Sequence, residues 1–327
     1  MKFPLLLLAL ATFTAAAWAD VEVKELPDRV RVEIDGQLFT EYHFSGTRRP
    51  YCYPVIGPSG AAMTRHWPLE DDVAAEEHDH PHHKGLWYGH HSVNGVGFWE
   101  ESAKPGVKIG TTVHDGFLEV KGGKDVGVIR AKNKWIVDES GEQICTDERT
   151  LRFQKVSDGR LLDYEITIKA GDQEVVFRDD KDGAMAIRMP ESMRVEKPKA
   201  KSEKTAQPGD GHIVTSEGKK DADAWGTRAD WCDYHGPVDG KTVGVAMFDH
   251  PANPRHPTWW HVRTYGLFAA NPFGQAQFEK LADKEAGAFK IAPGQSATFR
   301  YRFFFHEGDA EQAKVAEHYR EYTAAVK

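Results

Sequence analysis

Short runs of alternating residues separated by turn signals dominate the chain, and this pattern limits its fold most strongly. Residues 21–44 predict alternating strands that are interrupted at Pro27-Asp28 and again at Asp35-Gly36, which is a hairpin-type signal. Further strand-like runs follow at 116–123, 126–138, 143–156, 161–171, 242–250 and 287–308. Helical periodicity is almost absent between these runs. Regular strand–turn spacing of this kind predicts an antiparallel sandwich or barrel.

One helix is expected at the end of the chain, over residues 309–327. Asp309 is a candidate N-cap, and Gln312 stands three residues later as its capping-box partner. We expect this helix to pack against an edge of the sandwich. The predicted fold is therefore all-β, a large antiparallel β-sandwich with a C-terminal α-helix, and residues 20–327 are expected to form it as a single domain.

The first residues have the composition of a targeting segment. Lys2 precedes an apolar run that starts at Leu5, and a small-x-small sequence ends at Ala19. The apolar run is short for a membrane span. We therefore expect residues 1–19 to be a signal peptide and the mature protein to be periplasmic or secreted; an uncleaved anchor is the alternative. No later segment is apolar enough to cross a bilayer, so no membrane insertion is expected after cleavage.

Composition narrows the class of partner. A formal net charge of −8 argues against nucleic acid, because phosphate binding needs a basic surface. Aromatic residues make up 11% of the chain and nine are tryptophan, which is typical of exported proteins that stack sugars on aromatic rings; a tryptophan-rich core is the alternative. The three cysteines permit at most one intrachain disulfide and leave one thiol over. They are Cys52, Cys145 and Cys232.

A histidine-rich stretch stands out at residues 78–91, "HDHPHHKGLWYGHH". Its six histidines are His78, His80, His82, His83, His90 and His91. The His-x-His spacing can supply two metal ligands, and catalytic zinc usually adds a third protein ligand, but no HExxH or CxxC motif accompanies it. An imidazole that acts as a general acid or base is a second interpretation. Hydrogen-bonded histidines around a turn are the third. A divalent metal therefore stays open, and no organic cofactor is expected.

Other polar and aromatic residues are candidates for binding a substrate. Trp87, Asn94 and Trp99 follow the histidines among several glycines, and an aromatic wall beside an amide suits a polyol; core packing is the alternative. Arg65 precedes His66-Trp67, and Arg188 stands in an alternating apolar run, where a charge needs a partner or a ligand. For both arginines an internal ion pair is the alternative.

Residues 231–274 form the last polar and aromatic segment. Its candidate residues are Asp233, His250, Arg255, Trp260, His261 and Arg263. Because His261 and Arg263 are two apart, both can face one side of a strand. The tripeptide Asp-His-Pro occurs at 79–81 and again at 249–251. We expect these two loops to converge on one cleft, with chance similarity as the alternative.

Four segments together resemble a known family. "DHPHHKGLWYGHHSVNGVGFWE", "KDGAMAIRMP", "ADWCDYHG" and "DHPANPRHPTWWHVRTYGLFAANPFG" are similar to the DUF6807 family, which is often labelled methane oxygenase PmoA-like. That label implies an integral membrane protein, and this chain has no membrane span after its signal, so we do not infer an oxygenase function. The family's members tend to accompany sugar oxidoreductases and keto-glycoside-processing enzymes, which implies a carbohydrate role.

More loosely, the chain resembles galactose-mutarotase-type supersandwich proteins. "HHKGLWYGHHSVNGVGFW" and the closing "IAPGQSATFRYRFFFHEG" carry this resemblance. It implies a sugar site on a concave sheet face, where histidine and a carboxylate transfer protons. At the level of the fold, such a resemblance transfers the location of a site better than its chemistry.

These observations lead to one main hypothesis and two alternatives. The main one is an exported enzyme that acts on a sugar or keto-glycoside by proton transfer, as an epimerase, lyase or hydrolase. The catalytic candidates are His82 or His83, opposed by His250 or His261. The substrate-binding candidates are Arg65, Trp87, Asn94, Trp99, Arg188, Asp233, Arg255, Trp260 and Arg263. A non-catalytic carbohydrate-binding protein and a histidine-rich metal-binding protein are the alternatives.

Overall fold

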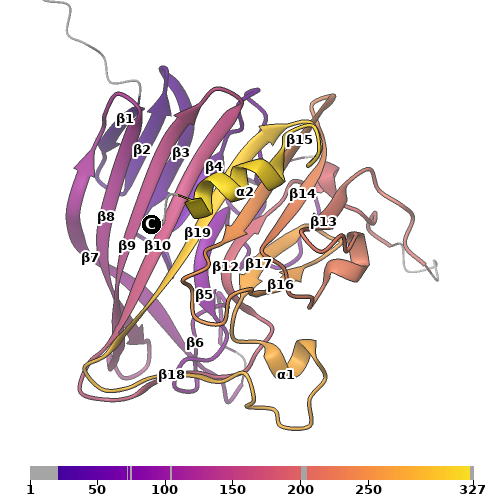
Figure 1. Ribbon diagram of the computed structural model, residues 1–327. Coiled ribbons are helices and arrows are strands. Elements are labelled where there is room, and N and C mark those ends of the chain that lie inside the picture. The colour runs from indigo at the N-terminus through magenta and orange to yellow at the C-terminus, as the bar shows by residue number, and fades with distance from the viewer. Residues whose placement is uncertain (1–20, 72, 74–75, 104, 200–204, 325–327) are drawn as a thin grey trace, which may run out of the picture.

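Two large β-sheets face each other in the computed structural model, which describes residues 21–71, 73, 76–103, 105–199 and 205–324 (Figure 1). One sheet has the strand order β1 (Val21–Glu25), β2 (Arg29–Ile34), β3 (Gln37–His43), β4 (Tyr51–Val55), β5 (Leu86–His90), β12 (Gly183–Arg188), β17 (Leu267–Asn271) and β16 (Trp259–Val262). The other has the order β13 (His212–Thr215), β14 (Trp231–Val238), β15 (Lys241–Asp249), β19 (Ser296–Glu307), β10 (Gly159–Ala170), β9 (Gln143–Val156), β8 (Val126–Val137), β7 (Lys108–Lys121) and β6 (Val96–Gly97). We call them the first and the second sheet. The predicted all-β sandwich is confirmed, whereas the predicted signal peptide at 1–19 lies outside the described residues.

Pairing within the sheets is antiparallel except between β6 and β7, and the turn signals account for much of it. Asp35 and Gly36 connect β2 to β3 with φ values of 53° and 72°. Positive φ at both central residues defines the hairpin turn whose twist matches that of the flanking strands. The hairpin predicted from this dipeptide is therefore present. A further pair, β11 (Val175–Phe177) with β18 (Phe289–Ile291), lies beside the two sheets.

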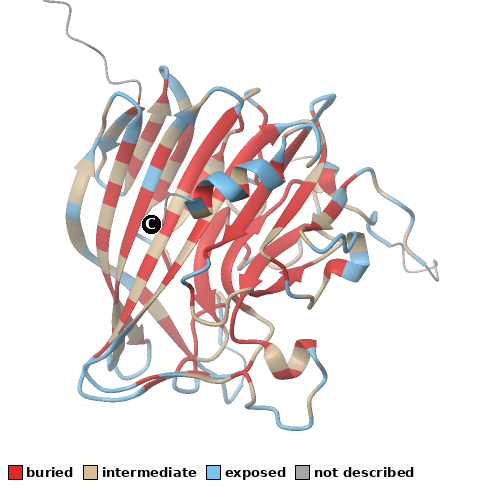
Figure 2. Ribbon diagram, in the orientation of Figure 1, coloured by how far each residue is buried: buried red, intermediate tan, exposed pale blue. Residues whose placement is uncertain are grey.

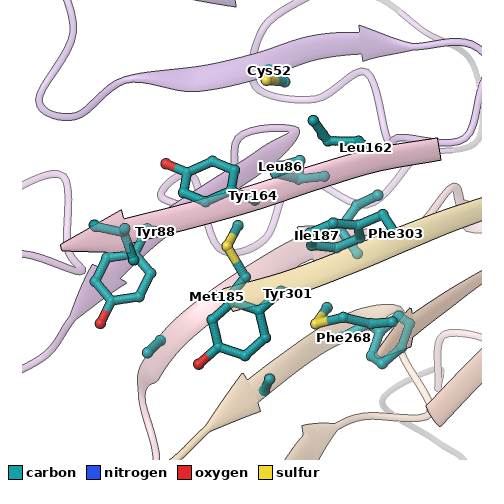
Figure 3. Packing of buried hydrophobic residues seen from close by; sticks show 14 of the residues in the cluster. Cys52, Leu86, Tyr88, Leu162, Tyr164, Met185, Ile187, Phe268, Tyr301 and Phe303 are labelled. Atoms are coloured by element: carbon teal, nitrogen blue, oxygen red, sulfur yellow. The ribbon is translucent and has the colours of Figure 1, made fainter. Parts of the chain in front are cut away.

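The core lies between the sheets and follows from the period-two alternation of the strands. Along β8, buried positions alternate with less buried ones, so one face of the second sheet enters the core. Met185 and Ile187 of β12 share this core with Tyr301 and Phe303 of β19 (Figure 3). The three cysteines are free and buried, and burial raises the pKa of the Cys52 thiol to about 12.

Four neighbouring strands of the first sheet, β5, β12, β17 and β16, are buried at every position (Figure 2). Their inner face contributes to the core. Their outer face is buried as well, so other parts of the chain must cover it. A sheet covered on both faces reads as a continuous apolar run, which explains why "GAMAIR" and "LFAAN" show little polar alternation. This covered outer face carries the candidate site.

The C-terminal helix α2 (Val315–Ala324) packs on the outer face of the second sheet, not at an edge of the sandwich (Figure 1). Its buried residues Val315, Tyr319 and Tyr322 contact Phe248 and Phe304, because those two side chains point away from the central core.

The predicted capping box forms ahead of this helix. Asp309 Oδ1 accepts the backbone N–H of Gln312 at 2.8 Å, and Gln312 Oε1 accepts that of Asp309 at 3.0 Å. The regular helix nevertheless begins at Val315, because Lys314 has a positive φ of 52° and interrupts the turns that follow the box. Among the described residues, no helix has the length and apolarity that crossing a membrane requires.

Candidate functional site

A pocket of about 530 Å³ opens on the outer face of the first sheet. Strand alternation orients the side chains beneath it: Leu86 and Tyr88 enter the core, so Trp87 between them points outward and is buried under the pocket. Ala186 is paired with Trp87 on one side and with Ala269 on the other, so small side chains lie at the centre of this surface. The pocket is lined by His80, Pro81, His82, His83, Trp99, Glu100, Glu101, Ser102, Lys181, Asp182, His261, Arg263, Tyr265 and Leu267.

A row of stacked rings forms one wall. Tyr265 stacks on His80 with 5.1 Å between centroids, His80 on His83 with 4.8 Å, and His83 on Trp87 with 5.4 Å. The His82 ring stands at 77° to that of His83, with 4.4 Å between their centroids. Stacks with such spacing are favourable, and they fix the planes of the imidazoles. The histidine-rich stretch therefore presents its rings in one defined arrangement.

A buried ion-pair cluster holds the histidine loop in place. Arg65, whose side chain is 0% exposed, binds the Asp79 carboxylate and donates from Nη2 to the Asp79 carbonyl at 2.8 Å. Arg188 Nη2 lies 3.4 Å from Asp79 Oδ1 and 3.3 Å from Glu191 Oε1. Burial would be costly for a lone charge, and these carboxylates supply the partners. Arg65 therefore forms an internal ion pair, which was the alternative to a role in binding substrate. It lies behind the pocket and does not line it.

Burial keeps the imidazoles of His82 and His83 neutral near pH 7. It lowers the pKa of His82 to about 4 and that of His83 well below its usual range. The Arg49 guanidinium adds to the shift at His82, and it also donates from Nη2 to the His82 carbonyl at 2.6 Å. A neutral imidazole has one donor and one acceptor nitrogen, so these rings suit hydroxyl groups.

The opposite wall holds His261 and Asp182. His261 Nδ1 donates to the Lys181 carbonyl, which can only accept, so Nε2 carries the lone pair in the neutral ring. Burial lowers the pKa of His261 to about 4. The Asp182 carboxylate lies 4.0 Å from His261 Nδ1. Burial alone would raise the pKa of Asp182, but the hydrogen bond from Lys181 and the charges of neighbouring groups together outweigh burial, so the pKa is lowered. A proton acceptor and an ionised carboxylate thus stand side by side.

The rim near Trp99 contains two further carboxylates, and each is already paired. Glu100 binds His91 Nδ1, and Glu101 accepts from Lys84 Nζ at 2.9 Å. Trp99 itself is nearly buried, and its ring centroid lies 5.2 Å from that of Trp87. Trp99 therefore provides an apolar surface between the histidines and the acidic rim.

The clustered histidines do not form a metal centre. Across the described residues, no group of three or more His, Cys, Asp or Glu side chains is arranged to hold a metal ion. His80 Nδ1 lies 2.8 Å from Asp79 Oδ2, and the ring faces of His80 and His83 contact each other. Because three converging ligands are the usual minimum for catalytic zinc, the residues present do not fit that group. The chemistry of the pocket is assigned to the side chains themselves.

Two predicted site residues lie away from this pocket. His250 lies near helix α2, with its ring 5.3 Å from that of Tyr322, and lines a different hollow. The two Asp-His-Pro loops therefore do not converge on one cleft. Asn94 sits in a turn, where its amide donates to the Glu174 carbonyl at 3.0 Å and accepts from the Val176 N–H at 2.6 Å.

Three more predicted site residues have structural partners elsewhere. Asp233 is fully buried in the second sheet between His235 Nδ1 at 2.6 Å and His306 Nε2 at 2.7 Å. Trp260 belongs to the core and donates to a backbone carbonyl. Arg255 donates to three backbone carbonyls, those of Pro272, Gly287 and Ala288.

The pocket also contains residues that the sequence did not single out. Lys181 and Asp182 immediately precede β12, and Tyr265 lies in the tight turn between β16 and β17. Strand ends and the turns between strands are where sites tend to form, so the polar pair before "GAMAIR" was the available signal. His82, His83, His261, Trp99 and Arg263 are the predicted residues that the structure brings together at the pocket surface.

The fold and the pocket define an all-β sandwich protein with a histidine-lined pocket on the outer face of one sheet. The family model of DUF6807, described as a family of unknown function, matches residues 29–320, and the chain belongs to this family. The resemblance drawn from the four sequence segments is thereby confirmed. A comparison with curated proteins found no match.

Several solved structures resemble the chain at low identity. The α-galactosidase from Lactobacillus brevis is 8% identical with a TM-score of 0.42, covering 90% of this chain and 40% of its own. A putative aldose 1-epimerase from Klebsiella pneumoniae is 11% identical with a TM-score of 0.39, covering 92% and 87%. One from Escherichia coli K12 is 10% identical with a TM-score of 0.33, covering 88% and 99%. The chain spans about two fifths of the length of the α-galactosidase.

Proposed function

We propose that the protein is an exported enzyme that acts on a sugar or keto-glycoside by transferring protons in this pocket. The observation that carries the proposal is the pairing of His261, with its unprotonated Nε2, and the ionised Asp182 across from the His82 and His83 rings. A volume of about 530 Å³ falls within the range of roughly 300–1,000 Å³ that is typical of small-molecule sites.

The reaction that suits these groups starts at a carbon beside a carbonyl group. His261 Nε2 takes the proton from that carbon, the electron pair of the C–H bond forms a carbon–carbon double bond, and the π electrons of the carbonyl group move onto its oxygen. Lys181 is a cation in the same pocket and would stabilise this oxyanion. Return of a proton to the opposite face gives an epimer, whereas departure of a group from the next carbon gives an elimination product.

The low pKa of His261 is compatible with this role. A base with a pKa of about 4 is unprotonated at neutral pH and ready to accept a proton. Negative charge that develops on the substrate raises the pKa of a neighbouring imidazole, so the base becomes stronger as the proton moves. The substrate therefore contributes to the strength of its own base.

A non-catalytic carbohydrate-binding protein is the second candidate, and the same pKa values favour it. General bases work best with a pKa near the working pH, and His82 and His261 lie well below it. In that case the neutral rings only form hydrogen bonds with the hydroxyl groups of the sugar, and the sugar is released unchanged.

Incubation of the purified mature protein with free aldoses and 3-keto-glucosides tests the proposal. NMR of the mixtures is expected to reveal an epimer, an elimination product or accelerated anomeric exchange. Binding without any of these across the panel would support the carbohydrate-binding protein instead. Export is tested separately: the N-terminus of protein recovered from periplasm or medium should be Asp20, and an intact residue 1 would contradict signal cleavage.

A further inference from the structure

Arg263 is a pocket residue whose charge has no counterpart. Its guanidinium lies over the Trp225 ring at 5.6 Å and over the Tyr265 ring at 5.5 Å. Among the described residues, its side chain forms no hydrogen bond and has no carboxylate within 4.0 Å. Aromatic rings occupy the faces of the guanidinium, whereas its N–H donors point along the edges. Those donors are free to bind a ligand.

Arg188 adds positive charge beneath the same end of the pocket. Its side chain is 0% exposed and lies 5.0 Å from the centroid of Tyr265, the ring that Arg263 also contacts. Within the described part of the chain, Arg188 Nε and Nη1 have no hydrogen-bond partner. The surrounding ion-pair cluster contains three arginines and only two carboxylates. The arginines are Arg65, Arg188 and Arg194, and the carboxylates are Asp79 and Glu191. One positive charge is therefore left over.

The acidic groups of the pocket do not compensate for this charge. Asp182 is bound by Lys181 Nζ at 2.8 Å, and Glu101 by Lys84 Nζ at 2.9 Å. Glu100 is bound by His91. The unmatched charge in the pocket is thus positive and lies beside Tyr265, where a negatively charged group of a ligand would complement it.

We propose that the pocket takes an acidic sugar, whose carboxylate binds the edge of Arg263 while Arg188 supplies positive potential from below. The inference rests on the proposed function, because it names the substrate class of the same pocket. A planar carboxylate matches the forked donors of a guanidinium in two parallel hydrogen bonds. Sulfate and phosphate esters share the charge but lack this planar fit.

Calorimetric titration of the wild-type mature protein tests the inference with two matched ligands. Methyl glucuronoside and methyl glucoside differ only in a carboxylate against a hydroxymethyl group, and the corresponding galactosides form a second pair. In at least one pair the acid is expected to bind about tenfold more tightly or better, because hydrogen bonds to charged groups are the stronger ones. Equal or tighter binding of the neutral sugar, or no binding of either acid, would overturn the proposal.

Two variants decide whether Arg263 is responsible. Arg263→Gln should remove the preference for the acid and leave the neutral sugar's affinity within about twofold. Arg228→Gln is the matched control, because Arg228 also stacks on an indole, at 4.5 Å from the Trp259 ring, yet lies outside the pocket; it should keep the preference. A preference that survives Arg263→Gln would contradict the assignment. Tighter binding of glucose 6-sulfate or 6-phosphate than of the glucuronoside would overturn the assignment of a carboxylate as the acidic group of the ligand.

Binding is measured without any need for turnover, so this inference and the proposed function fail separately. Acidic sugar that binds through Arg263 without conversion would refute the reaction and keep the inference. Conversion of neutral sugars with no preference for the acid would keep the reaction and refute the inference.

Discussion

A single hydrogen bond decides what His261 can do in the pocket. Because Nδ1 donates to the Lys181 carbonyl, the lone pair of the neutral ring must lie on Nε2. The neighbouring Asp182 is held ionised by Lys181, so the two groups offer a neutral and a charged acceptor. Sequence spacing placed His261 beside Arg263 but did not reveal which nitrogen is available.

Substitution of that ring tests its role. His261→Asn keeps an amide that can donate to the Lys181 carbonyl but removes Nε2, so kcat should fall about 10²- to 10⁴-fold, with sugar affinity changed only a few-fold. His212→Asn, a change at an exposed residue outside the pocket, should leave kcat unchanged. Steady-state kinetics and calorimetry measure both. An unchanged kcat in His261→Asn would remove His261 from the reaction.

The decline of kcat/KM at acid pH provides a second test of His261 as the base. A base must be unprotonated to act, and burial lowers the pKa of His261 to about 4. We therefore expect kcat/KM to be constant between about pH 6 and 8 and to decline only as the pH approaches 4. A decline centred near pH 6.5, the ordinary value of histidine, would show that a different, more exposed imidazole is the base.

At the scale of elements, the wall behind His261 depends on a segment that other loops hold in place. Helix α1 (Gln275–Phe278) brings the Phe278 ring to 6.0 Å from that of His261. Asp179 Oδ2 accepts the N–H groups of Ala276 at 2.7 Å and Gly287 at 2.6 Å, which fixes both ends of this segment. Arg255 bonds the same segment, so its role is to position the wall of the pocket.

Arg255→Ala should therefore destabilise the protein without removing any contact to the ligand. Three carbonyl groups lose their donor, which costs about 1–3 kcal/mol in the free energy of unfolding. Urea denaturation measures this loss, and Arg320→Ala, a change at an exposed arginine of helix α2, serves as the control. Full stability in Arg255→Ala, combined with lost sugar binding, would return Arg255 to the binding residues.

Across the whole molecule, buried neutral histidines link stability to pH. Burial lowers the pKa of His82, His83, His90 and His261 below the value of about 6.5 expected in the unfolded chain. Between roughly pH 4 and 6.5 the unfolded state therefore binds more protons, so acid favours unfolding. His91 and His235 act in the opposite direction, because their paired carboxylates raise their pKa.

The four histidines whose pKa is lowered should outweigh the two whose pKa is raised. We expect the free energy of unfolding to be highest above pH 6.5 and to fall by at least about 1 kcal/mol by pH 5, since one pKa unit corresponds to about 1.4 kcal/mol. Urea midpoints at pH 7.5 and 5.0 provide the measurement. A protein that is equally stable, or more stable, at pH 5.0 would contradict the burial of neutral imidazoles.

The sequence predicted local structure better than it predicted the site. Asp35-Gly36 and the capping box at Asp309 act over a few residues, so their sequence signals were sufficient. The site depends on which strands are neighbours: β5 lies beside β12, with β17 and β16 next, whereas β15 lies in the other sheet. That order brings His83 and His261 together and leaves His250 elsewhere, and a local pattern contains no information about it.

We propose that this pocket moves a proton on a carbon of a sugar, and hydrogen exchange measures that step directly. Purified mature protein is incubated with 3-keto-glucosides, with and without a C6 carboxylate, in D₂O, and the sugar is examined by NMR. We expect deuterium at the carbon beside the carbonyl group with wild-type protein and with His212→Asn, and loss of this exchange in His261→Asn. Sugar that binds in the pocket yet takes up no deuterium above the protein-free rate would contradict proton transfer by this pocket.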